Sequence, residues 1–262
     1  MTILDQLAAP TLAESWDNVG LMVGEPGHEI SGILVALDPT PGVLAEAKHR
    51  GCNTIVTHHP LIFKGLRSIR TDRPEGKILS LALLDRLAII GCHTNLDKAA
   101  GGVNDMLATR LGLLDCRSIL PEPDGAGTGP IGFGRIGSLP ATLGFDDFIS
   151  HLRRNLDLQV IKVAGPPPPE IRKVAVCGGS GSELAPLALA EGAQIFVSSE
   201  IKHDVARWAE SAGFCVADCG HFATENVMVA GLTALIRHGC SEQGLAVEVL
   251  ATESQSNPFR YY

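Results

Sequence analysis

Residues 32–63 read GILVALDPTPGVLAEAKHRGCNTIVTHHPLIF, and this stretch decides the fold. An apolar run rich in β-branched residues, 32–38, precedes an amphipathic stretch of helical length, 41–51, and a second apolar run, 53–58, follows. Strand, helix and strand in this order form a βα unit, which places both strands parallel in one sheet. The same alternation continues along most of the chain, so it predicts an α/β fold with mostly parallel sheets.

The rest of the chain supplies further elements of both kinds. Runs of the strand type lie at 88–93, 173–178, 194–199, 214–219 and 246–251, and helical periodicity at 75–87, 101–112, 144–158, 183–192, 202–213 and 224–239. The pattern breaks in PEPDGAGTGPIGFGRIGSLP, residues 121–140, where glycines and prolines are dense. We therefore expect two packed α/β lobes, residues 1–125 and 126–262, with chain ends that can be exchanged between them.

Composition restricts the classes of function. The formal net charge is −8 and the pI about 5.6, which argues against binding to nucleic acid, since that requires a basic face. Seven cysteines without a CxxC pair indicate free thiols, as in a reducing cytosol. The N-terminal residues lack the pattern of a signal peptide and no apolar run approaches about 18 residues, so we expect a cytoplasmic protein without a membrane segment.

The strongest local feature is the end of the run 53–58, where His58 and His59 stand next to each other before a proline. Ligands in α/β sheets collect outside the carboxyl ends of the strands, so both histidines fall where a site is expected. Adjacent residues on an extended backbone point in opposite directions. We therefore expect the pair to serve two ions rather than to chelate one, although a structural strand cap is the alternative.

Two further strand ends carry possible metal ligands. HTNLD, residues 93–97, follows the run 88–93 and offers Asp97 as an oxygen ligand, with His93 as a ligand or as a hydrogen-bond donor to one. GHFATE, residues 220–225, places His221 and Glu225 four residues apart at the start of a predicted helix, so both point to one face. Taken singly, each pattern also occurs in ordinary turns and helices.

The combination predicts a dinuclear metal site. Nitrogen and oxygen ligands together suit Zn, Mn, Fe, Co or Ni better than Ca or Mg. Five residues exceed the need of a single catalytic ion that keeps an open position. We expect two divalent ions held by these residues: His58, His59, Asp97, His221 and Glu225.

The glycine-rich loop Gly178–Gly181 follows the run 173–178 and precedes a helix. Backbone amides in such a loop can bind a phosphate, but the loop lacks the GxGxxG register and the lysine of a P-loop. A plain tight turn is the alternative. His93 and His203 are the candidates for proton transfer.

Several blocks of the chain form a recognisable set: WDNVGLMVG (16–24), THHPLIFKG (57–65), HTNLDKAAGGVND (93–105), IKHD (201–204), GHFATE (220–225) and NPFRYY (257–262). Together these blocks resemble the Nif-three-like dinuclear metal centre family, whose members carry the name GTP cyclohydrolase 1 type 2. The resemblance implies two interlocked lobes with the metal site in the cleft between them, assembled as a hexameric ring. It implies that His59 and Asp97 hold one ion, His58 and His221 the other, and that Glu225 bridges both. Glu200 stands where the family often has an aspartate, which leaves the role of that loop open.

Two functions fit these residues. The first is a metal-dependent hydrolase that acts on a small molecule, such as a nucleotide, a cyclic amide or a phosphoester, with GTP ring opening in this class. The second is a non-catalytic metal carrier, or a ring-shaped protein that binds a regulatory partner. A carrier gives up its ions to a competing apo-protein, whereas an enzyme retains them and loses activity on chelation.

Overall fold

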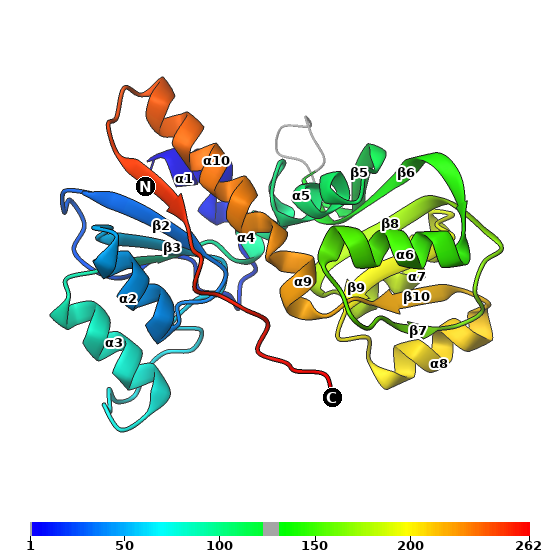
Figure 1. Cartoon of the computed structure of the whole chain (residues 1–262), viewed down its shortest axis with the longest axis horizontal. Helices are drawn as coiled ribbons and strands as arrows, with labels where there is room; N and C mark the ends of the chain where they lie inside the picture. Colours follow the sequence, from blue (N-terminus) through cyan, green and yellow to red (C-terminus); the bar gives the residue numbers. More distant parts are fainter. Residues whose placement is uncertain (1, 123–130) are drawn as a thin grey trace. The chain divides into compact units, whose positions relative to one another are not determined.

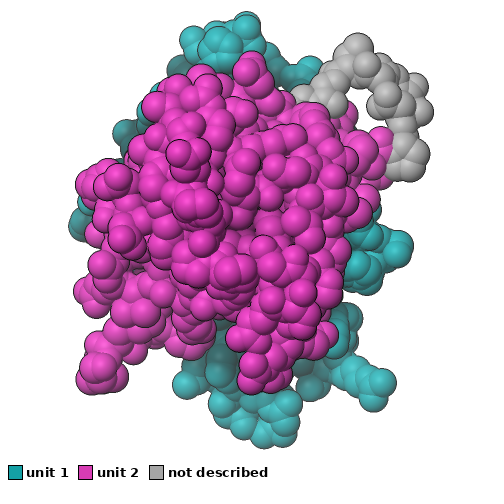
Figure 2. Space-filling model, turned by 90° about the vertical axis from the view of Figure 1, so that its right-hand side faces the viewer, with its two compact units in different colours: residues 1–96, 228–256 teal, residues 97–227, 257–262 magenta. Residues whose placement is uncertain are grey.

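The computed structural model describes residues 2–122 and 131–262 and divides the chain into two compact units, coloured separately in Figure 2. Unit 1 comprises residues 1–96 and 228–256, and unit 2 comprises residues 97–227 and 257–262. This division differs from the expected boundary at residue 125, which itself lies outside the described residues. The first crossing lies after residue 96 because residues 103–110 pack in a core of unit 2 and residues 114–121 pair with its sheet. The chain also returns to unit 1, because its last strand pairs with the sheet of that unit.

Unit 1 is built on a five-stranded sheet of order β1-β4-β3-β2-β11 (Figure 1). The strands are β1 (Gly20–Val23), β2 (Gly32–Ala36), β3 (Thr54–Thr57), β4 (Ala88–Gly91) and β11 (Glu248–Ala251). The four strands from β4 to β11 run parallel, and β1 pairs antiparallel with β4 at the edge. Every residue of β2 and β3 is buried, as expected for central parallel strands covered on both faces.

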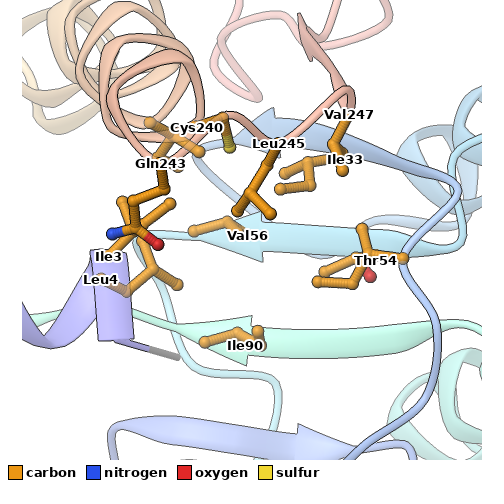
Figure 3. A pocket seen from close by; sticks show the side chains of 12 residues that line it. Ile3, Leu4, Ile33, Thr54, Val56, Ile90, Cys240, Gln243, Leu245 and Val247 are labelled. Atoms are coloured by element: carbon orange, nitrogen blue, oxygen red, sulfur yellow. The ribbon is translucent and has the colours of Figure 1, made fainter.

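The helical elements of unit 1 lie on the two faces of this sheet. They are α1 (Thr2–Leu7), the 3₁₀ turn η1 (Pro10–Leu12), α2 (Pro41–His49), α3 (Pro74–Leu84), and most of α10 (Val227–Glu242). On one face, Leu34 and Ile55 pack with Leu44 of α2 and Leu79 of α3. On the opposite face, α1 and α10 enclose an apolar cavity of about 190 Å³ with Ile33, Val56 and Ile90 in its wall (Figure 3).

Unit 2 is built on a six-stranded sheet of order β5-β6-β8-β9-β10-β7. The strands are β5 (Leu114–Pro121), β6 (Gly132–Gly144), β7 (Lys162–Ala164), β8 (Glu170–Ser180), β9 (Ile195–Ser199) and β10 (Cys215–Asp218). Pairing is parallel from β8 through β9 to β10 and antiparallel elsewhere. The parallel part contains the predicted strands, and their carboxyl ends lie at one edge of the sheet.

Alternate residues of the central strands of unit 2 enter two separate cores. Val174 and Val176 pack in the first core with Phe148 and Leu107, whereas Ala175 and Cys177 pack in a second core. The helical elements of unit 2 are α5 (Val103–Arg110), α6 (Phe145–Leu156), η2 (Ser182–Leu184), α7 (Ala185–Ala190), α8 (His203–Ala212) and α9 (His221–Glu225). The remaining helix, α4 (Thr94–Lys98), contains the point at which the chain passes from unit 1 to unit 2.

The α/β prediction is confirmed. All seven predicted strand runs coincide with strands, within a few residues at each end, and five of the nine strand pairings described are parallel. No helix in the described part of the chain is long and apolar enough to cross a bilayer. All seven cysteines are free thiols, in agreement with the sequence.

Candidate metal centre

Unit 1 gathers three imidazoles at the carboxyl ends of two neighbouring parallel strands. His58 and His59 directly follow β3, and His93 lies two residues beyond β4. Their candidate ligand nitrogens lie within 4.8 Å of one another. The ring centroids are 5.1 to 5.8 Å apart. The strand ends therefore bring these histidines together, as the position of ligand sites in α/β folds predicts.

The side chains of His58 and His59 do not point in opposite directions, as they would on an extended backbone. The strand ends at Thr57, whose hydroxyl donates to the carbonyl oxygen of His59 at 2.8 Å and so closes a bend. Beyond this bend the alternation of side chains no longer applies. His58 and His59 consequently face the same group, with their rings 5.1 Å apart.

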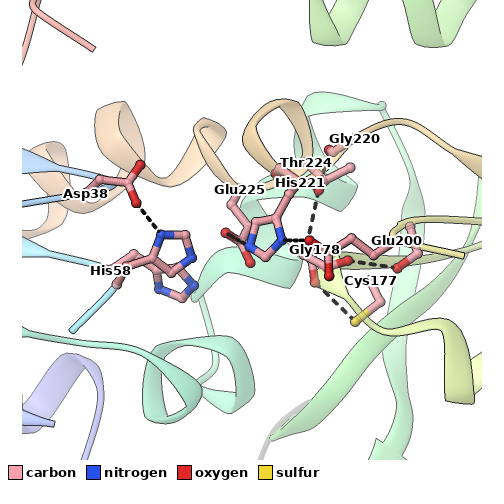
Figure 4. A network of polar contacts seen from close by, with 12 residues as sticks. Asp38, His58, Cys177, Gly178, Glu200, Gly220, His221, Thr224 and Glu225 are labelled. Atoms are coloured by element: carbon pink, nitrogen blue, oxygen red, sulfur yellow. Dashed lines mark hydrogen bonds and ion pairs between the residues drawn. The ribbon is translucent and has the colours of Figure 1, made fainter. Parts of the chain in front are cut away.

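Each imidazole of this group binds an oxygen acceptor through Nδ1. The acceptors are the Cys92 carbonyl for His58 (2.8 Å), the Asp38 carboxylate for His59 (2.7 Å, the dashed line from Asp38 in Figure 4) and the Asp17 carboxylate for His93 (2.8 Å). Because carbonyls and carboxylates only accept, Nδ1 carries the proton and Nε2 is the nitrogen that can ligate a metal. Histidines that bind metals in proteins are commonly oriented in this way.

Asp17 is the most constrained of these acceptors. Its side chain is fully buried, and it also accepts from the backbone amide and the hydroxyl of Thr94, at 3.0 and 2.5 Å. Burial alone would raise the pKa of Asp17, but the hydrogen bonds from His93 and Thr94 outweigh it and the pKa is lowered. Burial, together with the neighbouring His58, lowers the pKa of His93. A neutral imidazole is the form that binds metal.

Unit 2 places a histidine and a carboxylate on one turn of α9 (Figure 4). His221 Nε2 lies 2.9 Å from a carboxylate oxygen of Glu225, its i+4 neighbour, and His221 Nδ1 lies 3.0 Å from Oε1 of Glu200. The helix begins directly after Gly220, whose φ of +79° suits glycine. Glu200 thus orients His221 in the same way that Asp38 orients His59, which gives the loop after β9 a role.

The glycine-rich loop packs against these two side chains. A Cβ on Gly179 would lie 2.0 Å from Oε1 of Glu225 and 3.4 Å from Nε2 of His221. The amide of Gly178 donates to Asn104 and that of Gly179 donates to Thr224. These two amides therefore bind groups within the protein rather than a phosphate. Because Gly179 has no side chain, the carboxylate of Glu225 has room beside it.

Asp97 belongs to the same part of unit 2. Asn104, which is fully buried, donates to the backbone carbonyl of Asp97 at 3.0 Å and accepts from the amide of Gly178 at 2.9 Å. Asp97 itself is 9% exposed. One buried amide side chain thus connects the helix α4 to the loop that packs on Glu225.

The donor set of each unit suits a divalent transition metal. Unit 1 contributes imidazoles with Nδ1 engaged, and unit 2 contributes one such imidazole and two buried carboxylates. Such mixed nitrogen and oxygen donors favour Zn, Mn, Fe, Co or Ni over Ca or Mg. The residues present therefore fit a metal ion.

Not every predicted residue joins these groups. His203 is exposed at the first residue of α8, and no group of candidate ligands in the described residues includes it. Conversely, the role of Asp17 and Asp38 in orienting two of the imidazoles was not anticipated from the sequence. For Asp38 the available signal was its position, because it lies two residues beyond β2 just as His59 lies two residues beyond β3.

Comparison with known proteins gives a consistent result. The family model described as Duf34/NIF3 (NGG1p interacting factor 3) matches residues 1–258. A Streptomyces coelicolor protein named GTP cyclohydrolase 1 type 2 homolog is 35% identical, over 86% of this chain and 80% of its own length.

Solved structures show the same fold. The crystal structure of a hypothetical protein from Staphylococcus aureus is 31% identical, with a TM-score of 0.94 over 100% of this chain and 97% of that one. A Bacillus cereus protein related to NIF3 is 25% identical, with a TM-score of 0.93 over the same shares of the two chains. The match extends over both units.

Proposed function

This chain belongs to the Duf34/NIF3 family, and from that premise we propose that it binds two divalent metal ions and acts as a metal-dependent hydrolase. The proposed ligands are His58 and His59 of unit 1 and Asp97, His221 and Glu225 of unit 2. The resemblance assigns His59 and Asp97 to one ion, His58 and His221 to the other, and Glu225 to both. The proposed substrate is a nucleotide, a cyclic amide or a phosphoester. The relatives' name, GTP cyclohydrolase 1 type 2 homolog, supports the nucleotide.

One observation supports the proposal above the others. The four imidazoles of the candidate metal centre, His58, His59, His93 and His221, have Nδ1 bonded to an oxygen acceptor, so that each is held with Nε2 as the ligating nitrogen. A histidine that binds a metal gains both orientation and basicity from this arrangement, and all four imidazoles share it. Two bound ions would supply Lewis acidity and lower the pKa of a water molecule.

The remaining polar groups receive supporting roles in the proposal. His93 is either a further ligand or the group that transfers a proton, with Asp17 holding its ring in place. His203 remains a second candidate for proton transfer. Assembly into a homohexamer and a location in the cytoplasm complete the proposal, and both rest on the sequence and the resemblance.

The test compares His59→Ala with the wild-type protein. We expect purified wild-type protein to hold about two metal ions per chain by elemental analysis, and His59→Ala to lose at least one. His49→Ala, at an exposed position at the end of α2, is the matched control and should retain both. The metal-loaded protein is then assayed on nucleotides, phosphoesters and cyclic amides, and chelation should abolish any turnover that is found.

The alternative is a metal carrier or a regulatory ring protein, and the same preparation distinguishes it. A carrier should transfer its ions to a competing apo-protein with higher affinity and show no turnover on the panel. Loss of metal in His59→Ala together with complete inactivity of the loaded wild-type protein would favour the carrier and count against the hydrolase.

A further inference from the structure

Two exposed aromatic side chains lie next to the three histidines of unit 1. Trp16 is 57% exposed and Phe63 is 43% exposed, and their ring centroids are 5.8 Å apart at an interplanar angle of 58°. Large aromatic rings gain favourable free energy when they are buried. Two neighbouring rings that stay exposed therefore indicate a surface that receives a ligand or a partner. We call Trp16 and Phe63 the aromatic pair.

The aromatic pair is in contact with the candidate metal ligands through His93. The His93 ring lies 6.3 Å from Trp16 and 6.1 Å from Phe63, edge-on to both at 75° and 77°. His93 is at the same time one of the three imidazoles grouped within 4.8 Å. A ring that stacks on the aromatic pair would therefore lie beside the histidines to which the proposed function assigns metal binding.

The turn that carries Trp16 is fixed by its neighbour in sequence. Asp17 is buried and bonds both to His93 and to the amide and hydroxyl of Thr94. A side chain with these bonds fixes the backbone on which Trp16 stands. The position of the indole is thus set by the same carboxylate that orients His93.

The loop that carries Phe63 is tied to the same turn. The side-chain amide of Asn18 donates to the backbone carbonyl of Ile62, the residue before Phe63. Both aromatic residues therefore stand next to a residue that is held by a side-chain hydrogen bond. Because these segments are already ordered in the folded protein, less conformational entropy is lost when a ligand binds.

We propose that the aromatic pair is the substrate-selecting surface and that it binds a planar heteroaromatic ring by stacking. This inference rests on the proposed function and narrows its substrate to a nucleobase-like ring. Stacking requires a flat π face, which every nucleobase has and which a saturated cyclic amide or a sugar phosphate lacks. Neither side chain of the pair carries a charge, so discrimination here is between aromatic and non-aromatic rings.

Fluorescence of Trp16 tests the inference without reference to catalysis. The chain contains two tryptophans, so Trp208→Phe leaves Trp16 as the only one. Trp208 belongs to the other unit, unit 2, where it packs against a hydrophobic core. We expect adenosine to quench the fluorescence of this variant saturably. Uridine should quench it and 5,6-dihydrouridine should not, since these two differ only in the planarity and aromaticity of the base.

A substitution in the pair provides the second measurement. In the Trp208→Phe background, Phe63→Leu should weaken adenosine binding about 10- to 100-fold, as expected for the loss of one stacking partner. Phe259→Leu, at another exposed phenylalanine (73% exposed), is the matched control and should leave binding unchanged. Circular dichroism verifies that both variants are folded.

Failure of this inference can be distinguished from failure of the proposed function. His59→Ala should lose metal and still bind adenosine, so metal binding and ring binding are read separately. Equal quenching by uridine and dihydrouridine, or unchanged adenosine affinity in Phe63→Leu, would overturn the inference. Absence of saturable quenching by adenosine would also overturn it. If sedimentation then showed that Trp16→Leu abolishes self-association, the pair would be a contact between two copies of the chain.

Discussion

At the scale of single residues, Gly179 shows how closely the backbone of unit 2 approaches a proposed metal ligand. Its φ is +62°, and a Cβ at this position would fall 2.0 Å from Oε1 of Glu225. Alanine therefore introduces backbone strain and displaces the carboxylate. We predict that Gly179→Ala lowers metal affinity at least about 10-fold, which is the effect of disturbing groups that support metal ligands. Titration of cobalt or zinc against a chromophoric chelator measures the change.

Gly213 offers a matched control for this prediction. It also has a positive φ, +67°, but no heavy atom lies within 4 Å of the position of its Cβ. Gly213→Ala should share the cost of the strained backbone, about 1–2 kcal/mol, and retain full metal affinity. Equal metal affinities of Gly179→Ala and wild type would show that Glu225 is not a ligand.

At this scale the candidate ligands stand out in the sequence, whereas the groups that orient them do not. His58 and His59 stand out locally because they end a buried strand, and His221 and Glu225 because they are spaced by one helical turn. Asp38 lies 21 residues before the histidine that it orients, and Asp17 lies 76 residues before His93. Such contacts depend on how strands align in the sheet, which no local spacing reveals.

At the scale of secondary-structure elements, Glu46 of α2 holds the segment that follows β11. Its carboxylate accepts from the Thr252 hydroxyl, from the backbone amides of Glu253 and Ser254, and from Arg50. Burial would raise the pKa of Glu46, but these hydrogen bonds outweigh it and lower the pKa from 4.5 to about 2. The ionised side chain therefore stabilises the fold.

The stabilisation by Glu46 should depend on pH in a defined direction. Because the pKa is lower in the folded state, the contribution is fully present above about pH 4.5 and is lost as the pH falls toward 2. We predict that Glu46→Gln lowers the free energy of unfolding by about 1–2 kcal/mol at pH 7. Urea denaturation between pH 7 and pH 3 should show the difference from wild type shrinking below about pH 5.

A second glutamate close to Glu46 controls for the loss of charge alone. Glu253 lies 3.8 Å from Arg50, but its side chain is 85% exposed. Exposed ion pairs contribute little, so Glu253→Gln should change stability by less than about 0.5 kcal/mol. A pH-independent difference between Glu46→Gln and wild type would contradict the assignment of the lowered pKa to this carboxylate.

Strand β6 shows a physical reason why the sequence did not predict an element. Strand β6 reads GFGRIGSLPATLG, in which glycines and a proline hide the alternation typical of strands. Pro140 is tolerated because the register of β6 against β8 shifts between Ser138 and Leu143. Arg135, fully buried in β6, is compensated by Asp105 and by backbone carbonyls, a partnership that only the folded chain supplies.

At the scale of the whole molecule, the path of the chain between the units limits what a sequence can predict. The chain passes from one unit to the other after residues 96, 227 and 256, so neither unit is a continuous segment. The final pass depends on the parallel pairing of β11 with β2, whose residues are more than 200 positions apart. The irregular middle of the chain indicated two lobes, whose chain ends we expected to be exchangeable, but composition carries no signal of which end returns or of the strand with which it pairs.

The discontinuity predicts how the molecule responds to truncation. A chain that ends at residue 226 lacks α10 and β11, and therefore Leu232, Ile236 and Val249, all of which are buried. Each such side chain contributes about 1.5–3 kcal/mol, against a total stability of about 5–15 kcal/mol for a domain. We expect this shortened chain to be insoluble or to lack a cooperative thermal transition. A chain that ends at Ser256 keeps both elements and should melt cooperatively, whereas a folded, cooperative 1–226 chain would show that unit 1 does not need its C-terminal strand.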